Sequence, residues 1–182
     1  MKKRDFLKVG LKDYKTVGAV FLSSKYAVKK IIKQVKPDYK YIVEYGAGNG
    51  VITKELLKIL PPDGKILAIE LNKDLFYELS KIKDSRLKIL NDDVIEVSKN
   101  LVSLDWPRID AVISGIPLSF LKAQERIKLF QDTYEYLTLG GRFIVYQVSF
   151  FALPALKKVF KKVKKIIELR NIPPYFIMVG EK

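Results

Sequence analysis

Short apolar runs alternate with amphipathic segments along the chain from Tyr41 onward. The apolar runs have the length and composition of β-strands and occupy residues 41–45, 65–70, 86–90, 110–114 and 142–148. Helical periodicity fills the intervals between them, at about 50–60, 73–82, 94–102 and 119–138. This alternation predicts right-handed strand–helix–strand units in an α/β, Rossmann-like, doubly wound and mainly parallel sheet.

The last part of the chain departs from this alternation. A short helical pattern at 154–160 is followed by two strand-like runs, at 162–169 and 175–180. The residues between the two runs include Pro173 and Pro174, which are typical of a turn. We therefore predict a closing hairpin, which brings the sheet to seven strands and leaves the last strand antiparallel to the others.

Residues 1–36 precede the sheet, and we divide the chain into this segment and a domain at 37–182. Two basic helical patterns, at 4–14 and 23–35, place apolar and lysine side chains on different faces. Amphipathic helices of this kind either pack on their own domain, where they would cover a site, or lie in a membrane interface. Both alternatives stay open for this segment.

The 182 residues contain neither cysteine nor histidine. Disulfides, thiolate ligands and thiol nucleophiles are thereby excluded, and acid–base chemistry must use carboxylates, tyrosines, lysines or the backbone. We predict no metal site. No signal peptide is evident, and the longest uncharged run, 143–156, is shorter than a bilayer requires and contains Pro154. These features predict a cytoplasmic protein, and they are compatible with a monomer.

The net charge of +14 is concentrated in two segments. Residues 1–36 carry eleven Lys/Arg and two Asp, and residues 157–170 carry seven Lys/Arg and one Glu, whereas 37–156 is almost neutral. Basic segments on a neutral body attract polyanions, which are either nucleic acid or an anionic membrane surface. The alternative is that the lysines only keep the protein in solution.

A glycine-rich turn follows the first strand. Gly46, Gly48 and Gly50 alternate in the sequence YGAGNGV, and Val51 stands where a dinucleotide fingerprint has its third glycine, which argues against a classical NAD site. Glycine allows a tight turn and close approach of a ligand, and the next helix offers free N–H groups to a carboxylate. The alternative is that the glycines serve packing alone.

Acidic residues follow the second and third strands. Glu70 ends the second strand, where a carboxylate can accept hydrogen bonds from both hydroxyls of a ribose, although an acid there can also be merely solvated. Asp92, after the third strand, is placed to accept a hydrogen bond from an adenine amino group. The turn and the acids together indicate a nucleoside ligand.

The sequences VEYGAGNG, AIEL and LNDD resemble motifs I, II and III of the class I S-adenosylmethionine-dependent methyltransferases, over residues 41 to about 148. The resemblance implies that the glycine turn, with Ala47, borders the methionine end of S-adenosylmethionine and that Glu44 organises the site near its amine. It also implies that Glu70 and Leu71 lie at the ribose and Asp92 and Asp93 at the adenine. Ser114, after the fourth strand, completes the implied cofactor-binding residues.

The fourth strand ends in ISGIPLSF, where adenine-amino methyltransferases carry Asn or Asp, then Pro-Pro or Leu-Pro and an aromatic residue. Here the acceptor loop, defined as Ser114, Gly115, Ile116 and Pro117, has no carboxamide, and Leu118 follows it. This loop is similar to that of the bacterial phosphatidylethanolamine N-methyltransferases, which attach to membranes as soluble proteins.

The similarity to that family extends over nearly the whole chain. DYKTVGAVFLSSKYAVKKI resembles its N-terminal segment, with Gly18, Ala19, Val20, Ser23 and Ser24 matching and Phe21 departing. LTLGGRFIVYQVSF and the closing NIPPYFI, with its Asn-x-Pro-Pro pattern, resemble it as well. Family members include chains described as ribosomal adenine dimethyltransferases, and we expect this chain to lack the extra helical domain of those enzymes.

We therefore predict an S-adenosylmethionine-dependent N-methyltransferase that acts on the amine of phosphatidylethanolamine or a related aminolipid, associated peripherally with an anionic membrane surface. The alternative is an RNA adenine N6-methyltransferase with nucleic acid as its partner, and a small amine or a protein lysine is a third possible acceptor. Candidates for the proton acceptor are Tyr26, Tyr146 and Tyr175, each of which has an ordinary alternative as a packing residue. A desolvated amine can also lose its proton to water.

Overall fold

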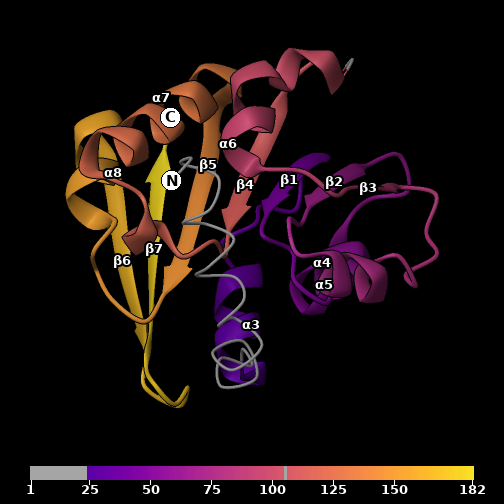
Figure 1. The fold of residues 1–182 in the computed structure, drawn as a ribbon, viewed down its shortest axis with the longest axis horizontal. Coiled ribbons are helices and arrows are strands. Elements are labelled where there is room, and N and C mark those ends of the chain that lie inside the picture. The colour runs from indigo at the N-terminus through magenta and orange to yellow at the C-terminus, as the bar shows by residue number, and fades with distance from the viewer. Residues whose placement is uncertain (1–23, 105) are drawn as a thin grey trace, which may run out of the picture.

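The computed structural model describes residues 24–104 and 106–182, which form a seven-stranded sheet in the order β3-β2-β1-β4-β5-β7-β6 (Figure 1). Strands β1 to β5 are parallel to one another, and β7 is antiparallel to both β5 and β6. The predicted doubly wound sheet, closing hairpin and antiparallel last strand are confirmed. The strands are β1 (Tyr41–Tyr45), β2 (Lys65–Ile69), β3 (Leu87–Leu90), β4 (Ile109–Ser114), β5 (Leu137–Gln147), β6 (Lys162–Glu168) and β7 (Tyr175–Glu181).

Helices cover both faces of the sheet (Figure 1). One face packs against α6, α7 and α8, and the other packs against α3, α4 and α5. Strand β1 serves both layers because alternate residues point to opposite faces: Val43 belongs to the first core and Ile42 to the second. The helices are α3 (Lys25–Ile32), α4 (Val51–Ile59), α5 (Lys73–Leu79), α6 (Val94–Val97), α7 (Ala123–Tyr136) and α8 (Leu153–Val159).

Two predicted helices are shorter than their sequence patterns. The pattern at 94–102 divides into α6 and a 3₁₀ segment, Ser98–Leu104, in which Asn100 has non-helical backbone angles. The pattern at 119–138 divides into the 3₁₀ turn Leu118–Phe120 and α7, because the backbone is extended at Leu121. In both places the apolar spacing continues through residues that leave the helical conformation.

Strand β5 begins at Leu137, five residues earlier than predicted. Gly140 and Gly141 lie inside it, and their backbones exchange hydrogen bonds with Lys182 after β7. The predicted start of this strand at residue 142 was therefore wrong. Glycine often marks a strand end in a sequence, but here Gly140 and Gly141 extend the hydrogen bonding between β5 and the end of the chain after β7.

Helix α3 comes from the basic N-terminal segment and packs on the domain. Ala27, Val28 and Ile31 are buried, and the Ser24 side chain caps the helix by accepting from the Ala27 N–H at 3.3 Å. The predicted helix at 4–14 and the matching residues Gly18 to Ser23 lie outside the described residues, and the division at residue 36 stays a prediction. In the described part of the chain, no helix is long and apolar enough to cross a membrane.

Asp110 holds the beginnings of β1 and β4 together. Its buried carboxylate accepts hydrogen bonds from the backbone N–H groups of Lys40 and Tyr41, at 2.8 and 3.0 Å. The other carboxylate oxygen lies 3.0 Å from the Arg108 guanidinium. A charged acceptor that satisfies two backbone donors at the centre of the sheet stabilises the register of both strands.

We predict that Asp110→Ala lowers the free energy of unfolding by about 2 kcal/mol or more, because two backbone donors lose their charged acceptor. Urea unfolding followed by circular dichroism measures this change. Glu55→Gln is the matched control, since it removes the exposed ion pair with Lys58 and is expected to cost about 0.5 kcal/mol or less. Equal effects of the two substitutions would contradict the role assigned to Asp110.

Candidate active site

The carboxyl ends of β1, β2 and β4 meet at one edge of the sheet. Tyr45 at the end of β1 is paired with Ile69 of β2 on one side and with Ser114 of β4 on the other. The chain leaves β1 between its two neighbours, and an open α/β sheet forms its binding crevice at such a point. The motifs singled out in the sequence therefore converge on one place.

The glycine turn packs directly against the acceptor loop. Gly46, Gly48 and Gly50 all have positive φ angles, of 73°, 59° and 83°. A β-carbon at Gly46 would lie only 2.7 Å from Cγ2 of Ile116, so the turn requires glycine both for its backbone and for its close contact. Helix α4 begins immediately after Gly50, and its first N–H groups face this edge.

Glu70 connects the glycine turn to the end of β2. One carboxylate oxygen accepts the Gly48 N–H at 2.8 Å, and the other accepts the Asn72 N–H at 2.8 Å. Burial raises the pKa of Glu70, and the two backbone donors oppose that shift. Each oxygen keeps a lone pair for a further donor, so the carboxylate can accept two ligand hydroxyls, as a ribose requires.

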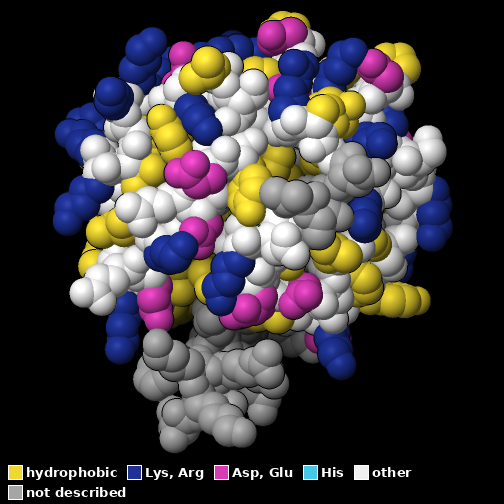
Figure 2. Space-filling model, turned by 90° about the horizontal axis from the view of Figure 1, so that it is seen from above, with side chains coloured by type: hydrophobic (Ala, Val, Ile, Leu, Met, Phe, Trp, Pro, Cys, Tyr) yellow, Lys and Arg dark blue, Asp and Glu magenta, His cyan; other side chains and the backbone are white. Residues whose placement is uncertain are grey.

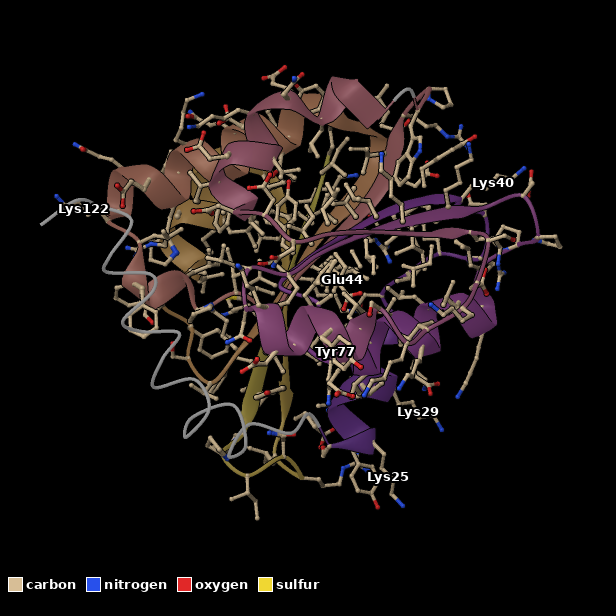
Figure 3. All side chains as sticks on the ribbon, turned by 45° about the vertical axis from the view of Figure 1, so that its right-hand side comes forward. Lys25, Lys29, Lys40, Glu44, Tyr77 and Lys122 are labelled. Atoms are coloured by element: carbon tan, nitrogen blue, oxygen red, sulfur yellow. The ribbon has the colours of Figure 1, made fainter. Side chains whose placement is uncertain are left out.

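Glu44 is buried at the centre of the molecule, under the start of α4 (Figure 3). Its Oε2 accepts the Thr53 hydroxyl at 2.6 Å, whereas its Oε1 has no hydrogen-bond partner among the described residues. Burial raises the pKa of Glu44 to about 8; the Thr53 hydrogen bond lowers it and the charge of Glu70 raises it. The role implied by the sequence, near the amine of S-adenosylmethionine, stays a prediction, because Glu44 is fully buried and is not among the residues that line the pocket at this edge.

A pocket opens between the glycine turn and the acceptor loop, and most of its lining is apolar. Asp93 borders this pocket, whereas Asp92 is exposed outside it and accepts the Asp93 N–H at 2.7 Å. Asp93 also caps α6 by accepting the Ile95 N–H at 2.9 Å. The lining residues are Gly46, Glu70, Leu71, Asp93, Val94, Ile95, Gly115, Ile116, Pro117, Phe120 and Leu121.

The acceptor loop is fixed by the ends of β4 and β5. The Gln147 amide donates to the Ile116 carbonyl at 2.9 Å, and a β-carbon at Gly115 would lie 2.3 Å from the Tyr146 hydroxyl oxygen. The Ser114 hydroxyl is buried and has no hydrogen-bond partner among the described residues. The loop thus presents backbone and aliphatic carbon to the pocket through Gly115, Ile116 and Pro117.

The three candidate tyrosines occupy different places. Tyr146 lies against the acceptor loop, and the Tyr175 ring is 6.0 Å from the Tyr146 ring. Tyr26 is on α3, outside the pocket lining, with the Arg170 guanidinium 4.2 Å from its ring. Tyr146 is thus the candidate that contacts the acceptor loop, although none of the three lines the pocket, and the assignment of a proton acceptor stays a prediction.

Sequence reasoning missed several residues of the site. Thr53 pairs with Glu44, Gln147 supports the acceptor loop, and the Asn91 side chain donates to the backbone carbonyls of Glu70 and Leu71. The position of Asn91 at the head of the motif NDD was the available signal. Thr53 and Gln147 carry no sequence signal, because their partners come from other elements. Among the described residues, no group of carboxylates is arranged to hold a metal ion.

Solved methyltransferases share this fold. Precorrin-6y C5,15-methyltransferase from Geobacter metallireducens superposes with a TM-score of 0.69 at 14% identity, covering 89% of this chain and 90% of that one. The N-methyltransferase NodS from Bradyrhizobium japonicum superposes with a TM-score of 0.70 at 10% identity, covering 85% and 93%. The fold and the site define a class I methyltransferase that uses S-adenosylmethionine. Within this class, the chain belongs to the ribosomal RNA adenine dimethylase family, whose sequence profile matches residues 10–140.

Most of the curated relatives found are ribosomal RNA small subunit methyltransferases. The protein from Wigglesworthia glossinidia brevipalpis is 39% identical over 90 residues, which cover 48% of this chain and 33% of that protein. An ornithine lipid N-methyltransferase from Singulisphaera acidiphila is 28% identical over 139 residues, covering 74% and 72%. The chain thus spans about a third of the first curated relatives it matches. The predicted membership of the phospholipid N-methyltransferases is not confirmed, and family and relatives together favour the RNA alternative.

We predict that Glu70→Gln weakens S-adenosylmethionine binding by about tenfold or more, because a neutral amide replaces a charged acceptor. Isothermal titration calorimetry measures the affinity. Glu78→Gln, on the exposed side of α5 where Glu78 pairs with Lys81, is the control and is expected to bind like the unaltered protein. Unchanged affinity in Glu70→Gln would show that Glu70 does not contact the cofactor.

The raised pKa of Glu44 makes stability depend on pH. The folded protein keeps a proton on Glu44 up to about pH 8, whereas the unfolded chain releases it near the ordinary value of 4.5. The stability that comes from the proton on Glu44 is therefore fully present below pH 4.5 and is lost as the pH rises through about 8. We predict that Glu44→Gln gains stability relative to the unaltered, cofactor-free protein between pH 5 and 8. Thermal melts across this range test it, and a constant difference would refute it.

Proposed function

We propose that this methyltransferase transfers a methyl group to the amine of an aminolipid, such as phosphatidylethanolamine, at a membrane surface. The observation that carries the proposal is the chemistry of the acceptor loop. An adenine amino group needs a carboxamide or carboxylate to orient it, and in this loop the corresponding position holds Ser114. Its hydroxyl is buried, and the wall of the pocket beside it is formed by Ile116, Pro117, Phe120 and Leu121.

An apolar pocket opening is suited to an amine that belongs to the head group of a lipid with acyl chains. Lipid amines sit at the membrane surface, so the groups next to them on the protein must tolerate both head group and hydrocarbon. Phe120 is 59% exposed beside the pocket, and Arg126 and Phe151 form a cation–π contact behind it at 4.2 Å. The match to the ornithine lipid N-methyltransferase supports the same acceptor class, because it covers about three quarters of both chains.

The residues present can carry out the transfer without a metal. When bound, S-adenosylmethionine supplies an electrophilic methyl group, which forms a bond to the amine nitrogen as its bond to sulfur breaks. In this proposal Glu70, the glycine turn and Glu44 would hold the donor, and the acceptor loop would align the nitrogen with the methyl group while the apolar wall of the pocket would exclude water. The acceptor ammonium must first lose a proton, and Tyr146, against Gly115, is the phenol placed to assist.

RNA adenine is the second candidate acceptor. It is favoured by the family to which the chain belongs and by the curated relatives that are ribosomal RNA methyltransferases. Basic side chains lie along the left, upper and right margins of the face at which β4 and β5 begin, interspersed with acidic ones (Figure 2), and basic side chains attract the phosphates of RNA and of a bilayer alike. The chemistry of the acceptor loop separates the two candidates, because RNA recognition would have to proceed without an amide at Ser114.

We predict that labelled S-adenosylmethionine transfers its methyl group to phosphatidylethanolamine in vesicles containing an anionic lipid, and that transfer falls when the anionic lipid is omitted. A parallel reaction contains total RNA in place of vesicles, and label is counted in the organic and aqueous phases. Glu70→Gln is the control that lowers either activity through the donor. Label in RNA alone would overturn the aminolipid proposal and assign the protein to adenine methylation.

A further inference from the structure

Exposed hydrophobic side chains gather at the edge of the sheet where β4 and β5 end. Of the ten large hydrophobic residues exposed in the described part of the chain, seven belong to α3, the segments after β4 and β5, or the β6–β7 hairpin. The most exposed of these are Ile172, at 89%, and Leu169, at 73%, both in the turn that joins β6 to β7. This turn projects from the lower end of the molecule in Figure 1, beside the start of α3.

The turn is anchored by buried polar contacts in spite of its exposure. Asn171 is buried, and its side chain accepts the Ser24 N–H and donates to the Pro173 carbonyl, both at 2.8 Å. Glu168 is buried at the base of the turn, where Arg170 binds it at 2.7 Å and Lys30 at 3.1 Å. Polar anchoring on the inner side therefore fixes the two aliphatic side chains on the outer side, where no described residue buries them.

A continuous set of contacts connects the turn to the acceptor loop. Gly115 adjoins the Tyr146 hydroxyl, Tyr146 packs against Tyr175, and Tyr175 pairs with Glu168 across the hairpin. The turn thus begins where this row of side chains ends. A surface that contacts the turn will consequently face the same edge of the sheet as the pocket.

The charges around the turn are predominantly positive. Lys25, Lys30, Lys165 and Arg170 come from α3, β6 and the turn itself, and Lys25 projects at the same lower end as the hairpin (Figure 3). Glu168 is the carboxylate that faces them, and it is buried and paired with Arg170 and Lys30. Two outward aliphatic side chains surrounded by cations match an anionic bilayer, whose interface accepts hydrocarbon below a layer of phosphates.

We propose that the β6–β7 turn is a membrane-insertion tip, in which Leu169 and Ile172 enter the acyl-chain boundary while the surrounding cations contact lipid phosphates. This inference deepens the proposed aminolipid function and rests on it for its purpose, since insertion here brings the acceptor pocket to the membrane surface. Bases of single-stranded RNA stack on aromatic and guanidinium groups, which Tyr26 and Arg170 supply beside the turn, but they gain little from the aliphatic Leu169 and Ile172, which are the most exposed side chains here.

The test compares Leu169→Ser/Ile172→Ser with Leu139→Ser. Leu139 is 87% exposed but lies near the beginning of β5, at the opposite edge, so it controls for loss of an exposed leucine. Cosedimentation with vesicles of phosphatidylethanolamine and an anionic lipid is expected to show binding reduced by about tenfold or more in the double variant. Leu139→Ser should bind like the unaltered protein, and thermal melts should show that all three proteins fold.

A second measurement reports insertion directly. Ile172→Trp should be quenched by vesicles with brominated acyl chains, whereas Leu139→Trp should not, with Trp106 as a background common to both proteins. Vesicle binding of the double variant equal to that of the unaltered protein, or equal quenching of the two tryptophan variants, would overturn the proposal. Binding of RNA but not of vesicles, weakened by the same substitutions, would overturn it in favour of an RNA surface.

Activity on a soluble acceptor separates this proposal from the proposed function. Short-chain phosphatidylethanolamine, kept monomeric, should be methylated equally by the unaltered protein and the double variant, because the turn lies outside the pocket lining. With phosphatidylethanolamine in vesicles, the double variant should lose methyltransferase activity, whereas the unaltered protein should keep it. If neither substrate is methylated while vesicle binding still depends on Leu169 and Ile172, the aminolipid acceptor is wrong and the membrane tip stands.

Discussion

The active-site edge depends on a single carbonyl oxygen, that of Ile69 at the end of β2. It accepts the N–H groups of both Gly46 and Ala47, at 2.9 and 3.0 Å, and so ties the turn after β1 to the neighbouring strand. The next N–H along the turn, that of Gly48, then donates to the side chain of Glu70, the residue that follows Ile69. The turn is thus organised by backbone geometry, which explains its three glycines with positive φ angles, and at Gly46 a β-carbon would also collide with Ile116 of the acceptor loop.

This arrangement leaves two buried polar groups, on Glu44 and Ser114, that are unfavourable for folding. Both place a buried polar oxygen beside the site without a hydrogen-bond partner among the described residues, and such groups destabilise a fold unless a ligand or water satisfies them. The raised pKa of Glu44 shows how the protein alone limits that cost, since the protonated form carries no buried charge.

The acceptor side is governed by different physics. It is built from the apolar residues after β4, supported by Gln147 and Tyr146 of β5, and it continues through Tyr175 to the β6–β7 turn. The profile of the ribosomal RNA adenine dimethylase family covers residues 10–140, and so includes both the glycine turn and the acceptor loop on which the aminolipid proposal depends. The hairpin and its turn lie beyond that match, and they are the part of the chain on which the membrane tip depends.

The sequence by itself determined which strand each functional segment follows: the glycine turn follows β1, Glu70 follows β2 and the acceptor loop follows β4. These follow from local rules, because strand periodicity, glycine spacing and acids at strand ends are readable within one segment. Only the tertiary structure decided that Asp93 rather than Asp92 borders the pocket, that Thr53 and Gln147 support it, and that Tyr26 lies apart from it. It also decided the helix ends at 94–104 and 118–123 and the early start of β5. Each of these depends on a partner from a distant element, and no local pattern records which partner that is.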